Sequence, residues 1–124
     1  MNLATLITNI KSAWSAAIPA TTLYFQLAPE KTSGQFAVFR LGTITPGEEE
    51  ITNRNWETTL TIGGFAASDT DVLTLSQSIV NLFDRGTING VYSCTVQSVE
   101  LDLNYGDQMM PWTVSTTVLI RWTV

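Results

Sequence analysis

Residues 112–124 alternate between apolar and polar side chains, and this alternation restricts the fold more than any other feature of the sequence. One set of alternate positions is apolar except at Thr116 and contains Trp112, Val114, Val118, Ile120, Trp122 and Val124. The other set is mostly polar and contains Thr113, Ser115, Thr117, Arg121 and Thr123. A period of two residues is typical of a strand with one buried and one wetter face. The sequence therefore predicts a sheet that is covered on one side only.

The same period predicts further strands at residues 23–27, 35–41, from about 51 to 64, and 91–105. The first two resemble a hairpin that turns at residues 29–34, and residues 42–50 read as an exposed loop. In the third strand Trp56, Leu60 and Ile62 share one face. Within residues 91–105 the apolar positions change phase near Gln97 or Ser98, which predicts a β-bulge.

Two stretches have the helical period instead. Near the start of the chain, apolar residues recur at spacings of three and four, and they are Leu3, Leu6, Ile7, Ile10 and Trp14. This spacing predicts a helix of about fifteen residues that begins after a cap at Asn2 and ends before Pro19. The sequence at residues 68–71 resembles a capping box, so we expect a second helix that ends near Arg85 and Gly86.

The expected order is therefore α-β-β-β-α-β-β, in one domain over residues 1–124. Two helices on one face of a sheet of about five strands form an α+β layer. Antiparallel pairing is expected, and a mixed sheet is possible. The uncovered face is expected to be rich in threonine.

Composition excludes several classes of protein. The chain is 44% hydrophobic with only 14% charged residues, whereas a disordered segment needs many charges and few aromatic residues. The net charge of −5 disfavours a nucleic-acid reader, which gains affinity by neutralising phosphates. No apolar run approaches the roughly 18 residues of a membrane span, and residues near the start lack a signal-peptide pattern. A soluble protein made in a reducing compartment is expected.

The sequence gives little support for catalysis or for a cofactor. It contains no histidine, so the commonest general base and metal ligand is missing. The single cysteine, Cys94, is expected to fill the core. Glu100 and Asp102 share a strand face and Asp107 follows, but the spacing of a calcium loop fails because Thr113 stands where a glutamate is required. We expect neither an enzyme nor a metal site, with a carboxylate enzyme as a remote alternative.

Two loops carry candidate contact residues. Glu48, Glu49 and Glu50 form the only charge run of the chain and are candidates for contact with a partner, although an acidic loop is usually just solvated. Met109 and Met110 are adjacent, so both cannot face inward, and methionine is common on adaptable binding surfaces. They are therefore candidates for a subunit interface.

Apolar residues also appear on the side of the sheet expected to be polar. Leu119 interrupts the polar positions of the last strand, and we expect Ala37, Phe39 and Leu41 on the second face of an earlier strand. One reading is a half-solvated sheet, and the other is a face that contacts another subunit. Leu119 and Phe39 are therefore further interface candidates.

The chain resembles the tail terminator, or tail completion, proteins of long-tailed bacteriophages. The resemblance rests on the opening helix over residues 3–14, the strands around residues 36–39 and 56–65, the helix that follows Ser68, and the closing strands over residues 91–103 and 112–124. It spans nearly the full length. It is a likeness of element order and hydrophobic pattern and includes no catalytic motif.

The resemblance implies a non-enzymatic subunit of the virion neck, assembled in the bacterial host cytoplasm. Such subunits close into a ring, typically a hexamer, which caps the tail tube protein and provides the surface joined by the head-tail connector. DNA passes through such a ring without specific binding, and Glu48 to Glu50 are our candidates for acids in its lumen. The alternatives are another neck, adaptor or tail tube subunit, or a small α+β accessory binding domain.

Overall fold

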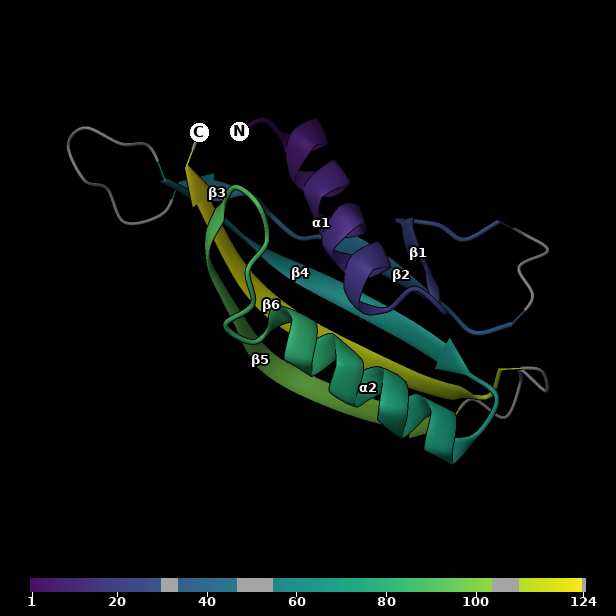
Figure 1. Ribbon diagram of the computed structural model, residues 1–124. Coiled ribbons are helices and arrows are strands. Elements are labelled where there is room, and N and C mark those ends of the chain that lie inside the picture. The colour runs from purple at the N-terminus through teal and green to yellow at the C-terminus, as the bar shows by residue number, and fades with distance from the viewer. Residues whose placement is uncertain (30–33, 47–54, 104–109, 124) are drawn as a thin grey trace.

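The computed structural model describes residues 1–29, 34–46, 55–103 and 110–123, and folds them into two helices and a six-stranded sheet. The elements are α1 (Leu3–Ala17), β1 (Thr22–Phe25), β2 (Phe36–Leu41), β3 (Thr45–Pro46), β4 (Asn55–Ala66), α2 (Asp69–Phe83), β5 (Val91–Leu103) and β6 (Trp112–Thr123). Both helices lie on the same face of the curved sheet (Figure 1), which we call the inner face, and the opposite face is the outer face. The predicted α+β class and element order are confirmed, with β3 as an addition.

The strand order is β1-β2-β4-β6-β5, and β3 pairs with β4. The central pair, β4 and β6, is antiparallel and keeps one register from Asn55 opposite Thr123 to Ala66 opposite Trp112. The pairing of β5 with β6 shifts register twice, once after Val91 and once after Val96. The second shift confirms the bulge predicted near Gln97 or Ser98, and the first was not predicted. The sheet therefore has β1 and β5 as its two edges.

The expected hairpin of the first two strands is wrong, because β1 and β2 are parallel, with Thr22 opposite Phe36. After β1 the chain enters a left-handed conformation at Gln26, whose φ is 65°. The backbone N–H of Gln26 donates to the Phe39 carbonyl, 2.8 Å away, before the chain returns to the level of Thr22. Alternation along a strand shows which residues share a face, but it does not show the direction of the neighbouring strand.

Part of the expected loop over residues 42–50 is a strand. Thr45 lies opposite Glu57, and Pro46 lies opposite Trp56, which makes this short segment β3. Its two residues are exposed. Proline is tolerated at a sheet edge because it has no N–H to donate to a further strand. The predicted start of the next strand near residue 51 lies outside the described residues, which resume at Asn55.

Both helices begin at the predicted caps. The Asn2 side chain accepts a hydrogen bond from the Thr5 backbone N–H at 2.8 Å, and the Ser68 hydroxyl accepts one from the Asp71 N–H at 3.2 Å. Each cap satisfies an N–H group that has no partner inside its helix. The start of each helix is therefore set by its local sequence.

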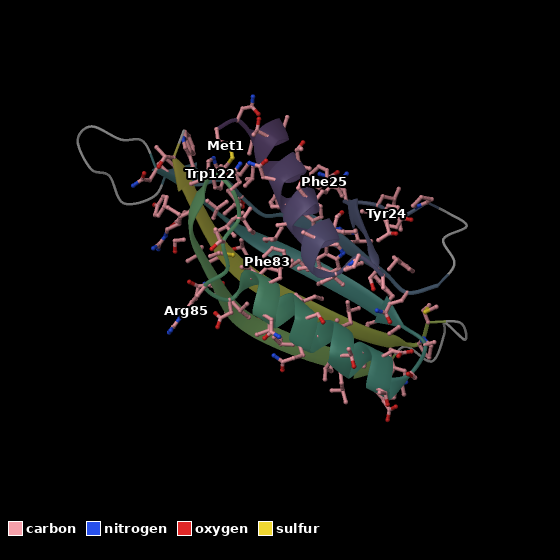
Figure 2. The ribbon with its side chains drawn as sticks, in the orientation of Figure 1. Met1, Tyr24, Phe25, Phe83, Arg85 and Trp122 are labelled. Atoms are coloured by element: carbon pink, nitrogen blue, oxygen red, sulfur yellow. The ribbon has the colours of Figure 1, made fainter. Side chains whose placement is uncertain are left out.

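The core lies between the helices and the inner face. Its fully buried large side chains are Trp14, Trp122, Phe39, Phe83, Leu6, Ile10, Leu60, Ile62, Leu75, Ile79, Ile88 and Ile120. Trp14 donates its indole N–H to the Thr21 carbonyl at 2.7 Å, so its one polar group is satisfied within the core. Figure 2 labels Phe83 and Trp122 on this side of the sheet.

The assignment of Ala37, Phe39 and Leu41 to the second face is wrong. Ala37 and Phe39 are fully buried in the core, and Leu41 packs against it. Alternation then places Phe36, Val38 and Arg40 of the same strand on the outer face. Phe39 therefore belongs to the core of the single subunit, and it is removed from the candidates for a subunit interface.

Candidate interaction surface

The outer face carries the predicted hydroxyl-rich surface, and no helix of the described residues covers it (Figure 1). On the central strands Thr61 lies beside Thr117, and Thr59 lies beside Leu119. On the edge strand Ser98 lies beside Thr117, and Thr95 lies beside Leu119. Hydroxyl side chains on neighbouring strands tolerate water and can pair with each other. This part of the face is therefore compatible with solvent or with a polar partner.

Leu119 lies where the sequence predicted, between Thr59 and Thr95 on the outer face, and it is half-buried. Its direct neighbours across both strand pairs are threonines. Single apolar side chains among polar ones are normal on protein surfaces. Leu119 remains an interface candidate, but only as part of a larger surface.

An aromatic cluster that the sequence reading missed lies at one end of the outer face. Phe36 stacks on Phe65 with ring centroids 4.7 Å apart, and Tyr24 meets Phe36 edge to face at 6.4 Å. All three side chains are half-buried. We call Tyr24, Phe36 and Phe65 the outer aromatic cluster. The alternation of β2 could have shown that Phe36 faces outward. It did not, because Ala37, Phe39 and Leu41 were expected on that face instead.

The other end of the outer face carries an ion pair. Nε of Arg121 lies 3.0 Å from Oε2 of Glu57, and the two side chains are 42% and 30% exposed. Glu57 and Arg121 are direct neighbours across β4 and β6. At this exposure the pair contributes at most about 1 kcal/mol to folding. While the pair is intact, the charges of Glu57 and Arg121 largely neutralise each other at this end of the outer face.

The edge strand β5 forms the second exposed surface. Val99 and Leu101 are 42% and 44% exposed, and Leu73 of α2 is 55% exposed. Ala66, Trp112 and Leu103 lie in one row across the sheet, so β5 ends at the same end of the sheet as α2 begins. Exposed apolar residues along an unpaired edge are a site where another chain can bind.

Acidic side chains flank these apolar residues. Glu100 and Asp102 alternate with Val99 and Leu101 along β5, and Asp69 and Asp71 occupy the first turn of α2. We call the apolar residues Val99, Leu101 and Leu73, with the acids Glu100, Asp102, Asp69 and Asp71, the β5 edge surface. Glu100 and Asp102 lie opposite Ser115 and Thr113 on the outer face, whereas Val99 and Leu101 lie on the inner side with α2, so the edge carries its β5 acids and its apolar residues on opposite faces.

A small cavity lies at the other end of the sheet, where α1 begins. It has a volume of about 230 Å³ and is lined by Met1, Asn2, Leu3, Ile44, Trp56 and Trp122. The lining side chains are apolar except for Asn2 and the indole N–H groups of the two tryptophans. Figure 2 shows Met1 beside Trp122 here, and the Met1 amino group donates to the Thr123 carbonyl at 3.1 Å.

Cys94 lies in the core, as predicted, with only 5% of its surface exposed. Burial, together with the negative charge of Asp84, raises the pKa of the Cys94 thiol from 9.0 to about 12. The thiol is therefore protonated at neutral pH. Since the thiolate is the nucleophile and the metal ligand, Cys94 is chemically inert in this position.

The remaining chemical candidates are placed as follows. Over the described residues, no three His, Cys, Asp or Glu side chains come together in a group that could hold a metal ion. Glu100 and Asp102 lie on an exposed strand, and Asp107 lies outside the described residues. Within the same part of the chain, no helix is long and apolar enough to cross a membrane.

The two loop candidates are only partly covered by the structure. Glu48, Glu49 and Glu50 lie outside the described residues, and so does Met109. Met110 is described and is half-buried, two residues before β6 begins at Trp112. The roles expected for these residues stay predictions.

Comparison with known proteins adds no assignment. No protein-family model matches the chain, and no curated protein sequence matches it significantly.

Proposed function

We propose that this chain is a non-enzymatic subunit of a ring at the head-proximal end of a bacteriophage tail. The ring, a hexamer by the resemblance, ends the growth of the tail tube and offers the surface to which the neck of the head is joined. The observation that carries the proposal is the one-sided helix layer of the described residues, which leaves the outer face and the β5 edge surface uncovered. Apolar area of this kind is typical of a surface for other subunits.

The charge of the chain supports this role. A net charge of −5 in each copy is multiplied by the symmetry of a ring. A negative lumen repels phosphate, so DNA would pass without being held. We assign Glu48, Glu49 and Glu50 to the lumen or to docking, and Met109 with Met110 and Leu119 to contacts with a neighbouring subunit or with the tail tube protein.

Size-exclusion chromatography with light scattering, followed by negative-stain microscopy, tests the proposal. We expect a defined oligomer at micromolar concentrations and closed rings of uniform diameter with an open centre. A monomeric mass at every concentration, or open filaments in the images, would contradict it. Stacks of rings that lengthen into tubes would instead identify a tail tube subunit, which is the nearest alternative.

The cavity at the start of α1 favours a second candidate, a small accessory binding domain. Its volume of about 230 Å³ and its lining by Trp56 and Trp122 suit a small apolar molecule. A strictly monomeric protein whose melting temperature rises with small aromatic compounds would support that candidate. A ring-forming protein with an unchanged melting temperature would exclude it.

A further inference from the structure

The two edges of the sheet, β5 and the β1–β2 edge, differ in charge. The β5 edge surface carries Asp69, Asp71, Glu100 and Asp102, while β5 and the first turn of α2 contain no lysine or arginine. The four carboxylates are exposed. Glu100 and Asp102 lie on the outer face of β5, whereas Asp69 and Asp71 lie on the helix side, and no cation on these elements neutralises either pair. A partner that brings a positive charge to the outer side of this edge would gain from Glu100 and Asp102.

The opposite edge of the sheet, at β1 and β2, carries positive charge. Arg40 is exposed on the outer face of β2, and β1 and β2 contain no acidic residue. Together with Gln26, Leu27 and Leu41, Arg40 lines a cleft of about 390 Å³. Leu27 is 80% exposed, more than any other large apolar side chain of the described residues. We call Arg40, Leu27 and this cleft the β1–β2 flank.

The two surfaces cannot satisfy each other within one chain. β4 and β6 lie between β2 and β5. Three strand spacings, or about 14 Å, therefore separate β2 from β5. That distance is too long for an ion pair between Arg40 and Glu100. Each copy therefore presents an acidic, apolar edge on one side and a cationic, apolar flank on the other.

Charge also argues against the simplest alternative, a two-fold dimer through β5. Antiparallel pairing of two β5 edges would bring Glu100 and Asp102 of one copy close to the same residues of the other. Like charges on adjoining strands are destabilising. Inward or edge charges of this kind are a common device against edge-to-edge pairing of identical strands.

We propose that copies of this chain associate head to tail, with the β5 edge surface of one copy against the β1–β2 flank of the next. Arg40 meets the carboxylates of Glu100 and Asp102, and Leu27 provides apolar area for Leu101. A heterologous contact of this type repeats around a ring when its rotation closes. The inference rests on the proposed function, because it names the contact by which the ring would be built.

Charge reversal on each side tests this contact. Sedimentation velocity at physiological salt is expected to show association at least tenfold weaker for R40E, and for E100K combined with D102K. An equimolar mixture of the two variants is expected to recover assembly. When the two variants alternate, every head-to-tail contact joins opposite charges. The control is R85E, which changes the net charge as much as R40E does but alters an exposed cation after α2. It should associate as the wild type does.

Each result decides between the two proposals. All four positions are exposed, and circular dichroism melting confirms that the variants fold. Wild-type rings that are unaffected by R40E, or a mixture that fails to recover assembly, would overturn the head-to-tail contact and leave the ring intact. Filaments that respond to the charge changes as described would overturn the ring and support the contact. A wild-type protein that stays monomeric overturns both.

Discussion

Two phenylalanines of one strand show how differently the two faces of the sheet are used. Phe39 is fully buried on the inner face and contacts Phe25 with ring centroids 5.0 Å apart. Phe36, three residues earlier in β2, is half-buried on the outer face and stacks on Phe65. The residue type and the strand are the same. The helix layer, and not the hydrophobicity of the side chain, decides which of them belongs to the core.

The same contrast recurs in β4, where two adjacent glycines face opposite sides. A Cβ atom on Gly64 would lie 2.8 Å from a methyl group of Leu75 and 2.8 Å from one of Val114, so the inner face has no space for it. A Cβ atom on Gly63 would meet nothing nearer than the Phe65 ring, at 3.7 Å. The inner face is packed to the level of one methyl group, whereas the outer face has room for a partner.

The largest expected effect separates the two phenylalanines. Phe39→Ala should lower the free energy of unfolding by about 3–5 kcal/mol, because it leaves a cavity in a closed core. Phe36→Ala should lower it by about 1–2 kcal/mol, because it removes an aromatic stack and partial burial only. Urea denaturation of both variants measures the difference.

Equal destabilisation by the two substitutions would contradict the difference between the two faces. If the two substitutions were equally destabilising in monomeric protein, the outer aromatic cluster would be part of the core and not an uncovered surface. Assembly can also be compared under conditions in which both variants are fully folded. If Phe36→Ala then weakened assembly and Phe39→Ala did not, the outer face would have a direct role in association.

The elements that depend on local sequence were predicted well. Asn2 and Ser68 cap their helices through bonds to residues three positions ahead, and such bonds are visible in a one-dimensional pattern. The alternation of β6 and the phase change near Gln97 are equally local, and the strand and bulge they predicted are present. The fold class followed from these elements.

The parts that depend on distant residues were not predicted. The residues of β2 are apolar on both sides, so only the docking of the helices makes Ala37 and Phe39 the buried set. The parallel direction of β1 depends on the path of the chain beyond Gln26. The β5 edge surface was missed for a similar reason. Glu100 and Asp102 were considered as a catalytic carboxylate pair or as metal ligands, and the fact that β5 ends beside the start of α2 appears only in the register of the sheet.

A smaller effect, opposite in sign on the two faces, is expected at the paired glycines. Gly64→Ala should destabilise the protein by about 1–3 kcal/mol, because Leu75 and Val114 must move to admit the methyl group. Gly63→Ala should be neutral or should stabilise by up to about 1 kcal/mol, because alanine reduces the freedom of the unfolded chain. Thermal melting of the two variants gives the sign directly, and a stabilising Gly64→Ala would show that the inner face is loosely packed.

An effect that is absent at neutral pH tests whether the inner face stays dry as far as the edge strand, where Cys94 is buried and its neighbour Thr95 is exposed. The pKa of Cys94 is raised from 9.0 to about 12 in the folded protein. Below pH 9 the thiol is protonated in both states and has no effect on stability. Between pH 9 and 12 unfolding releases a proton, so this thiol should lower stability by about 1.4 kcal/mol for each pH unit.

The Cys94→Ala variant isolates this contribution from the other groups that titrate at high pH. Its stability relative to the wild type should improve as the pH rises from 8 to 10.5, since only the wild type loses the protonated thiol on unfolding. Urea denaturation across this range measures the difference. Parallel pH profiles would mean that the Cys94 thiol ionises as easily in the folded chain as in the unfolded one. Water would then reach the inner face beside β5, and the contrast between the two faces would end at β6.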